Sequence, residues 1–372
     1  MPTTLMLAAP YLVDANDPRQ VGSYPVDSDI FFHFCNAFKD IGWDVCLPDW
    51  QLEAGQLTLA VEPTSDRVDA LMDRGCEQLT AFLDLNYVPS GDTNETDAVA
   101  LTRRLLDRYG PRMRVAAFVG DSYMRDGLVE IMQACAEIAD IVISPYQGTI
   151  DVLTLLGHAD IAGKVHTIPC VPPRFFAGSS RAAADSARVF DACYVGSLKR
   201  PRASALRAAL NIEGIKLNIS TAGRVPEKNN HTRRIEDYLD IYLKSAFSIC
   251  SAAVPQRVIA TVHESLHVVQ PPVFPGRVAE SIACGCLPIY VTGCALETLP
   301  IPKTQDDFPW IGIPEDAIER DLPRVISSRR RIAPVEAFRS YHRQFLSAEA
   351  VLGPVIQRLW RNPATAPEPL AG

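Results

Sequence analysis

The sequence predicts an α/β protein built from two domains, each with a parallel β-sheet covered by helices. Three observations lead to this prediction. The chain has 372 residues, whereas single hydrophobic cores rarely grow beyond ~250–300 residues. Short apolar runs alternate with amphipathic stretches along the chain, which is the pattern of βαβ units. Residues 172–188, rich in Pro, Ala and Ser, separate two such series and form the expected linker.

The first series predicts an N-terminal α/β domain over residues 1–180. Two amphipathic stretches, residues 29–42 and 94–110, have the periodicity of helices that cover a sheet. The second ends on Gly110, and glycine is the commonest residue just after a helix. The expected strands are the short apolar runs at residues 4–9, 44–48, 79–85, 114–120, 140–145 and 165–169.

The second series predicts a C-terminal α/β domain over residues 181–335. It opens with a strand that runs into a Gly-Ser turn and then a helix. Its expected strands are residues 190–197, 215–220, 246–251, 286–292 and 310–313. After this domain, residues 336–372 are expected to hold a C-terminal helix and a frayed tail. The helical pattern itself begins slightly earlier, at residue 334, and reaches residue 362.

Composition narrows the classes of function. A formal charge of −8 disfavours a protein held on nucleic acid by bulk charge, although a local basic groove stays open. The ten cysteines include no CxxC pair, which favours reduced thiols and disfavours a metal site. No basic segment opens the chain and no apolar run reaches ~18 residues, so neither a signal peptide nor an integral membrane segment is expected. We expect a cytoplasmic protein.

The strongest chemical signal lies in residues 275–288, PGRVAESIACGCLP. A helix should begin at Gly276 or Arg277 and end on Gly285, directly before a buried strand. Arg277 and Glu280 are one turn apart near the start of this helix, where backbone N–H groups and the helix dipole attract anions. A diphosphate could lie above Gly276, with Arg277 binding its oxygens and Glu280 accepting hydrogen bonds from ribose hydroxyls. The alternative is an ordinary surface ion pair.

The pattern Arg277-x-x-Glu280-x-x-Ala283-x-Gly285-x-x-Pro288 resembles the donor-site helix of GT-B glycosyltransferases. The run ACGCLPIYV is similar to exostosin-type and fucosyltransferase-type enzymes, and residues 191–210 resemble the C-terminal domain of spore-maturation-type bacterial glycosyltransferases. The resemblance covers most of residues 190–292. It implies two facing Rossmann-like domains with a cleft between them, the acceptor in the first and the nucleotide-sugar donor in the second.

The resemblance also implies the reaction, transfer of a sugar from a UDP- or GDP-linked donor to an acceptor that the sequence does not identify. Glu280 would bind the ribose, and Arg277 would stabilise the diphosphate leaving group without a bound metal or any cofactor besides the nucleotide-sugar co-substrate. Many retaining families carry a second glutamate eight residues earlier, where this chain has Pro272. The stereochemical outcome is therefore open. Further expected donor-binding residues are Gly196, Ser197, Lys199, Arg200 and Arg224.

A general base should come from the N-terminal domain, facing the acceptor across the cleft. Asp27, Asp29 and His33 are the best candidates, although Asp27 could instead cap the helix that begins at Asp29. Asp84, at the end of one predicted strand, and Asp121, just after another, also lie where cleft residues tend to be found.

Three other functions stay open. The chain could bind nucleotide-sugars without catalysis, since its base is unsettled, or its acceptor could be modified DNA, as in some viral enzymes of this fold. Residues 263–267, HESLH, match the zinc protease pattern HExxH, in which two histidines on one helix face bind zinc. We disfavour this third function because the surrounding residues are β-branched and the segment is closed by Pro271 and Pro272.

Overall fold

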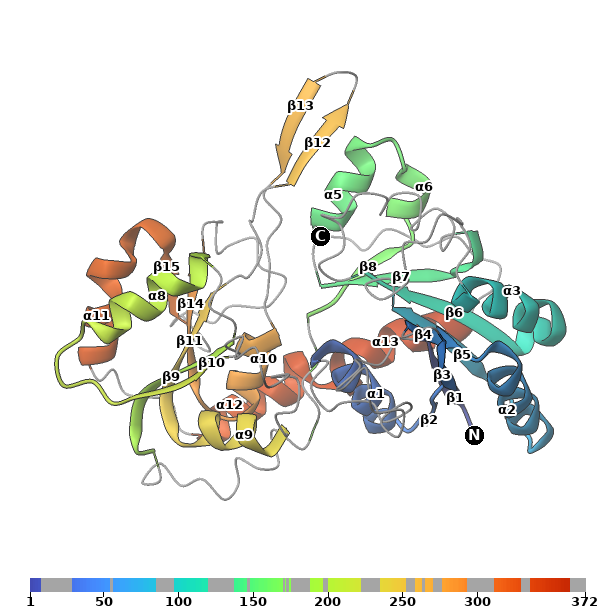
Figure 1. Cartoon of the computed structure of the whole chain (residues 1–372), viewed down its shortest axis with the longest axis horizontal. Coiled ribbons are helices and arrows are strands. Elements are labelled where there is room, and N and C mark those ends of the chain that lie inside the picture. The colour runs from blue at the N-terminus through green and yellow to red at the C-terminus, as the bar shows by residue number, and fades with distance from the viewer. Residues whose placement is uncertain are drawn as a thin grey trace.

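Two parallel β-sheets, each covered by helices, lie side by side in the computed structural model (Figure 1). One sheet comes from the N-terminal half of the chain and the other from the C-terminal half, so the predicted fold class of two Rossmann-like α/β domains is confirmed. The structure describes residues 1–7, 29–53, 56–84, 97–119, 137–145, 148–169, 171, 174, 188–196, 200–221, 235–251, 258–262, 265–269, 276–292, 311–328 and 335–361. The proposed domain boundary near residue 180 lies outside these residues.

The N-terminal sheet has the order β2-β1-β5-β6-β7-β8, and every neighbouring pair is parallel. The chain leaves β1 toward one edge and then returns to its other side, and ligands of such sheets bind at this reversal, outside the carboxyl ends of the strands. The strands are β1 (Thr3–Leu7), β2 (Asp44–Cys46), β5 (Leu79–Asp84), β6 (Met113–Phe118), β7 (Ile141–Ser144) and β8 (Val165–Thr167). The other elements are α1 (Asp29–Asp40), the antiparallel pair β3 (Trp50–Glu53) and β4 (Gln56–Leu59), α2 (Val61–Asp73), α3 (Asp97–Tyr109), η2 (Gly110–Arg112), α5 (Gly148–Leu155) and α6 (Ala159–Ala162).

Alternating side chains of this sheet build two separate cores, one on each face. Leu5 and Leu7 of β1 enter the core beneath α2 and α3, whereas Met6 enters the core beneath α1. On that second face Phe34 of α1 packs against Phe82 and Phe118, with ring centroids 4.8 and 4.9 Å apart. These aromatic contacts fix α1 on the sheet, and α1 carries the predicted base His33.

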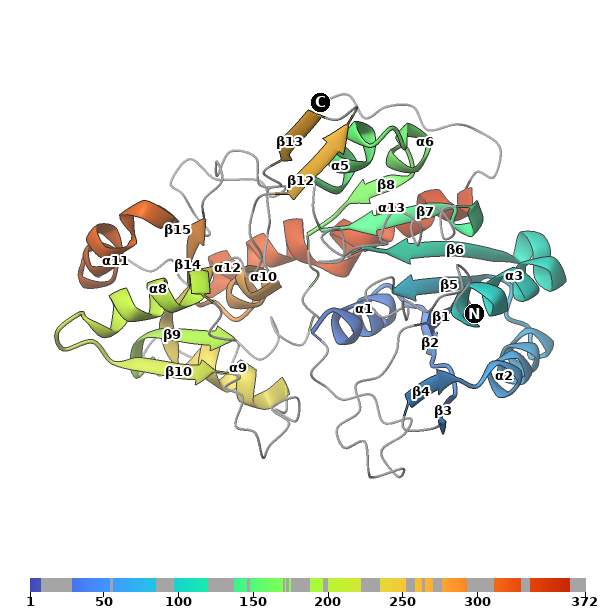
Figure 2. The same ribbon diagram turned by 45° about the horizontal axis from the view of Figure 1, so that its top comes forward.

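The C-terminal sheet repeats the same plan, with the order β10-β9-β11-β14-β15 and only parallel neighbours. Here the reversal lies between β9 and β11. The strands are β9 (Phe190–Gly196), β10 (Leu217–Thr221), β11 (Ser245–Ser251), β14 (Leu287–Thr292) and β15 (Ile311–Pro314). The helices are α8 (Arg200–Leu210), α9 (Ile235–Leu243), α10 (Gly276–Ala283), η7 (Glu315–Ala317) and α11 (Ile318–Ser327). Figure 2 shows β5 and β6 of one sheet and β9 and β10 of the other pointing their carboxyl ends toward the middle of the molecule.

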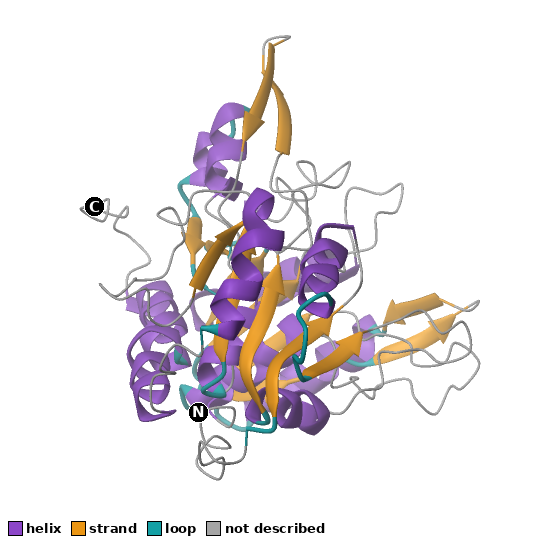
Figure 3. Ribbon diagram, turned by 90° about the vertical axis from the view of Figure 1, so that its left-hand side faces the viewer, coloured by secondary structure: helices purple, strands orange, loops and turns teal. Residues whose placement is uncertain are grey.

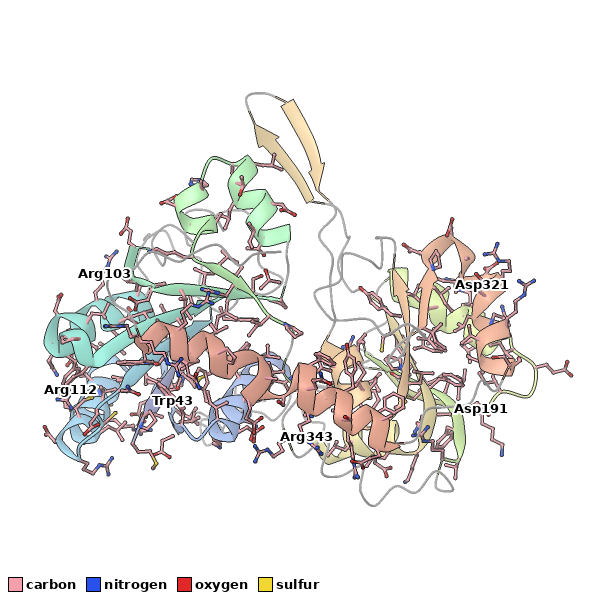
Figure 4. The ribbon with its side chains drawn as sticks, turned by 180° about the vertical axis from the view of Figure 1, so that it is seen from behind. Trp43, Arg103, Arg112, Asp191, Asp321 and Arg343 are labelled. Carbon is pink, nitrogen blue, oxygen red and sulfur yellow. The ribbon has the colours of Figure 1, made fainter. Side chains whose placement is uncertain are left out.

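The end of the chain crosses from one half to the other (Figure 4). A single helix was predicted here, but the structure has α12 (Val335–Tyr341), a π-helical turn η8 (His342–Leu346) and α13 (Ala348–Arg361). The prediction of one helix is wrong because Ser347 has an extended backbone and its Oγ accepts a hydrogen bond from the N–H of Ala350 (3.2 Å), which starts a new helix. Phe338 of α12 lies in the core of the C-terminal half. Leu352 of α13 lies in the core beneath α1 of the N-terminal half.

Helix α13 is held on the N-terminal half by aromatic and polar contacts. Trp360 donates from its indole N–H to Oγ1 of Thr80 (3.1 Å), and the guanidinium of Arg114 lies 5.4 Å from the centroid of the Trp360 ring. Trp43, labelled beside α13 in Figure 4, lies with its ring centroid 6.3 Å from that of Trp360. Helix α13 therefore packs into the same core as α1, on one face of the N-terminal sheet.

We predict that Leu352→Ala lowers the free energy of unfolding of the N-terminal half by ~2–5 kcal/mol, the usual range for truncating a fully buried leucine. Urea unfolding measures this loss. Val351→Ala, which truncates a half-buried residue of the same helix, serves as the control and should cost less. Equal costs would mean that α13 is not anchored through its Leu352 face.

Residues 265–267 of the HESLH segment lie in a strand, whereas His263 and Glu264 lie outside the described residues. Strands β12 (Val258–Val262) and β13 (Ser265–Val269) pair antiparallel, with Val262 opposite Ser265. The hairpin projects beyond the sheets and contacts α5 of the other half (Figures 1 and 3). The helical interpretation of this segment is therefore wrong, because its β-branched residues favour an extended backbone. His267 lies on a strand, so the helix face that a zinc protease needs does not form. No helix within the described residues is long and apolar enough to span a membrane.

Candidate functional site

Helix α10 has the bounds that its sequence predicted. It begins at Gly276, ends at Ala283, and is followed by Gly285 in the left-handed region (φ 73°), a conformation that glycine adopts without strain. The N–H groups of Gly285 and Cys286 donate to the carbonyls of Ile282 (3.0 Å) and Ser281 (2.8 Å), which closes the last turn. Strand β14 starts two residues later, so α10 is fixed at its carboxyl end by the central part of the sheet.

Glu280 of α10 joins the two halves of the molecule. Its Oε1 accepts a hydrogen bond from Nε2 of His33 on α1 (3.2 Å), and its Oε2 accepts one from the hydroxyl of Tyr242 on α9 (3.0 Å). Glu280 is only 7% exposed, His33 2%, and Tyr242 is fully buried. A carboxylate from the expected donor half thus lies within hydrogen-bond distance of an imidazole from the expected acceptor half.

The surroundings of Glu280 favour its ionised form. Burial alone raises the pKa of a carboxyl group, but the hydrogen bonds from His33 and Tyr242 and the nearby charges of His33 and Arg277 outweigh that effect, so the pKa of Glu280 lies below its ordinary value. Burial and the negative charge of Glu280 raise the pKa of Tyr242 well above its ordinary value. Tyr242 therefore acts as a hydrogen-bond donor, and Glu280 as a charged acceptor, at neutral pH.

This lowered pKa predicts how stability depends on pH. A carboxyl whose folded-state pKa is lowered stabilises the fold above its unfolded-state value, near 4.5, and that contribution is lost as pH falls toward the folded-state pKa. Glu280→Gln should therefore be less stable than wild type at pH 7, and the difference should shrink below about pH 4.5. Urea unfolding from pH 7 to pH 3.5 measures it; a difference that does not change with pH would contradict the prediction.

The structure brings together three of the predicted site residues: His33, Arg277 and Glu280. Arg277 lies half-buried in the first turn of α10, and its carbonyl accepts a hydrogen bond from Oγ of Ser281 (2.6 Å). The charge of Arg277 is close enough to act on both neighbours. It helps to lower the pKa of Glu280, and it offsets part of the rise in the pKa of Tyr242. Gly276, as predicted, is the first residue of α10.

The other predicted site residues are described only in part. Gly196 ends β9 and Arg200 begins α8, at the carboxyl end of a central strand, and Asp29 begins α1. Nothing further is described of the side chains of Asp29 and Arg200. Four predicted residues, Asp27, Ser197, Lys199 and Arg224, lie outside the described residues.

Tyr242 is the site residue that the sequence analysis missed. It lies near the end of α9, directly before β11. Lys244, the residue after α9, is about half-exposed, and its Nζ pairs with Asp240 of that helix (2.7 Å). The available signal was a tyrosine within an apolar run, because a buried tyrosine hydroxyl requires a hydrogen-bond partner.

Several buried thiols lie close to this site. Cys193, Cys250, Cys284 and Cys286 are buried around the base of α10, and burial raises the pKa of Cys250 to about 12. All seven described cysteines are free and buried. Among the described residues, no group of three or more His, Cys, Asp or Glu side chains could hold a metal ion. We assign these thiols to packing.

Comparison with known proteins places the fold. No protein-family profile and no curated sequence matches the chain. A solved α-glucosyltransferase in complex with UDP matches with a TM-score of 0.60 and 14% identity over 96% of this chain and 99% of that one. The same type of enzyme with UDP and a 13-mer DNA containing an HMU base matches with a TM-score of 0.58 and 14% identity over the same shares. Anabaena HepE with UDP matches with a TM-score of 0.54 and 10% identity, also over 96% and 99%. The chain has the two-domain GT-B-type fold of these structures.

Proposed function

We propose that this protein is a glycosyltransferase that moves a sugar from a nucleoside diphosphate donor to a hydroxyl acceptor bound between its two halves. The observation that carries the proposal is the position of Glu280. It lies on the helix that the sequence assigned to the donor, its surroundings favour its ionised form, and it meets an imidazole of the opposite half. Two α/β halves with the carboxyl ends of their strands facing each other provide a site where donor and acceptor can meet.

Glu280 has the hydrogen-bonding capacity that ribose recognition requires. An ionised carboxylate offers about four lone-pair positions. His33 and Tyr242 each use one, on different oxygens, so each oxygen keeps acceptor capacity for a ribose hydroxyl. Because the two residues that donate these hydrogen bonds are buried, the carboxylate is held in one orientation before the nucleotide-sugar binds. This reduces the entropic cost of binding.

The diphosphate would lie at the start of α10. The N–H groups of the first turn and the helix dipole favour negative charge there, and Arg277 adds a cation in the same turn. As the sugar–phosphate bond breaks, negative charge develops on the diphosphate, and contacts that strengthen with this charge lower the barrier. We propose that these groups replace a bound metal.

We further propose His33 as the general base, with Asp27 and Asp29 as the alternatives. A carboxylate that holds one nitrogen of an imidazole orients the ring and stabilises its protonated form. Glu280 is placed to do both for His33. Because His33 and Glu280 come from opposite halves, this pair forms only when the halves are together, which would couple catalysis to closure.

The donor and acceptor classes can be ranked for testing. The α-glucosyltransferase and HepE structures contain UDP, so UDP-sugars come first and GDP-sugars second. One of those structures also contains DNA, which makes DNA with a hydroxymethylated base a specific acceptor to include. The formal charge of −8 favours a small or carbohydrate acceptor over DNA.

The experiment measures release of UDP or GDP from a panel of nucleotide-sugars, with and without saccharide, small hydroxylated and hydroxymethylated-DNA acceptors. Nucleotide release that depends on one acceptor class supports the transferase and identifies its acceptor. Saturable UDP binding with no turnover for any acceptor would instead indicate a nucleotide-sugar-binding protein without catalysis. Absence of binding by every nucleotide would overturn the proposed donor site.

A further inference from the structure

Tyr242 and Glu280 form a hydrogen bond within the C-terminal half that the sequence motif does not contain. Tyr242 lies near the end of α9, directly before β11, and Glu280 lies on α10. The phenol hydroxyl donates to Oε2 at 3.0 Å, and both residues are buried. The other oxygen, Oε1, faces α1 of the opposite half, as its contact with His33 shows. The two oxygens therefore have different surroundings, one inside the half and one toward the other half.

We propose that Tyr242 is a positioning residue of the donor site: it holds Oε2 of Glu280 so that Oε1 is presented toward the opposite half, where the nucleotide ribose would bind. This inference rests on the proposed function and adds a residue that acts on the donor only through Glu280. Without the phenol, the carboxylate could rotate about its terminal torsion, which is broad in glutamate. With it, one orientation is favoured before binding.

The chemistry of the phenol suits this task better than a charged donor would. Its hydroxyl remains protonated at all working pH values, because burial and the adjacent carboxylate both raise the pKa of Tyr242. It can therefore donate to the carboxylate without neutralising it, whereas a buried lysine or arginine would add a competing charge. The ring also packs within an apolar cluster that includes Cys193, Leu239 and Ala283, and this packing fixes the position of the hydroxyl.

The test is a double-mutant cycle with UDP and 2′-deoxy-UDP as probes. Calorimetry gives the affinity of wild type, Tyr242→Phe, Glu280→Gln and the double variant for each nucleotide. We expect Tyr242→Phe to weaken UDP binding about ten-fold, the size of one hydrogen bond to a charged group, and to reduce the preference for UDP over 2′-deoxy-UDP. In the Glu280→Gln background the same substitution should have little further effect. Turnover should show a raised donor KM with kcat changed less than about two-fold.

A matched control and three outcomes separate this inference from the proposed function. Tyr290→Phe removes a hydroxyl from another fully buried tyrosine of the same half and should leave the UDP preference intact. No UDP binding by wild type, or full binding by Glu280→Gln, would overturn the proposed donor site itself. If Glu280→Gln loses UDP affinity while Tyr242→Phe binds UDP as wild type does, only the role of Tyr242 is overturned. An equal loss from Tyr242→Phe in both backgrounds would also overturn it, because the effect would not pass through Glu280.

A second variant gives a result if Tyr242→Phe does not fold. Glu280→Asp keeps the charge but shortens the side chain by one methylene, which withdraws the carboxylate from the Tyr242 hydroxyl. We expect its UDP affinity to fall to the level of Glu280→Gln. Wild-type affinity in Glu280→Asp would mean that the position of the carboxylate set by Tyr242 does not matter.

Discussion

Replacing Glu280 by alanine is expected to abolish the stabilisation of this protein by UDP. At a UDP concentration 100 times the dissociation constant, wild type should gain ~2.7 kcal/mol of unfolding free energy, because a ligand that binds only the folded state shifts the equilibrium by mass action. Glu280→Ala removes the acceptor for the ribose and leaves the buried Tyr242 and His33 donors without their carboxylate. Thermal unfolding with and without UDP measures the difference, each variant being compared with its own ligand-free state.

The same variant should also be less stable without ligand, by ~3 kcal/mol, since removing one partner of a buried hydrogen-bonded network leaves the others unsatisfied. Glu336→Ala is the matched control. Glu336 lies 70% exposed on α12, paired with Arg339 one turn away (3.1 Å), and its loss should change neither the ligand-free stability nor the UDP shift appreciably. A full UDP shift in Glu280→Ala would remove the main support for a donor site on α10.

The features that the sequence predicted well are those set by neighbouring residues. Gly285 ends α10 because it can adopt a positive φ, and Leu287 starts a buried strand because an apolar run follows directly. The alternation of strands and helices is likewise a pattern of neighbouring residues, and it predicted both parallel sheets. Arg277 and Glu280 could be placed on one helix because their spacing is local.

Two local patterns were ambiguous, and one interpretation of each was wrong. The HESLH spacing fits a helix face, but Val258, Ile259 and Val268 supply the β-branched residues of a hairpin, and tertiary context selected the strands. Likewise, residues 334–362 have a helical pattern throughout, yet Ser347 divides them. The helical segments before and after Ser347 pack into different cores. The spacing of apolar residues along the sequence does not show which core each segment enters.

The contacts that define the candidate site are the part that sequence reasoning could not supply. His33 was a candidate because a base from the N-terminal domain would face the acceptor across the cleft, and Glu280 because of its motif in the second half. Their contact depends on how the two halves meet, which involves residues far apart in the chain. Tyr242 was missed because only the folded structure brings α9 beside α10. Such long-range pairs are fixed by packing, not by spacing.

His33→Gln provides the sharpest test of catalysis at this contact. Glutamine can still donate an N–H to Oε1 of Glu280, so it keeps the link between the halves, but it cannot accept a proton. If His33 is the general base, kcat should fall by ~10²–10⁴-fold while the donor KM changes little. Steady-state turnover with the acceptor found in the panel measures both. His33→Ala, which removes the link as well, should lose at least as much kcat.

The comparison of these two variants decides between a base and a simple connection. Near-normal turnover in His33→Gln together with a large loss in His33→Ala would mean that His33 only joins the halves, and the base would then be sought at Asp27 or Asp29. His158→Gln, at the residue before α6, is the control for a histidine substitution in the same half and should leave kcat unchanged. Because glutamine preserves the hydrogen bond and removes only the acid–base function, a loss confined to kcat can be assigned to proton transfer.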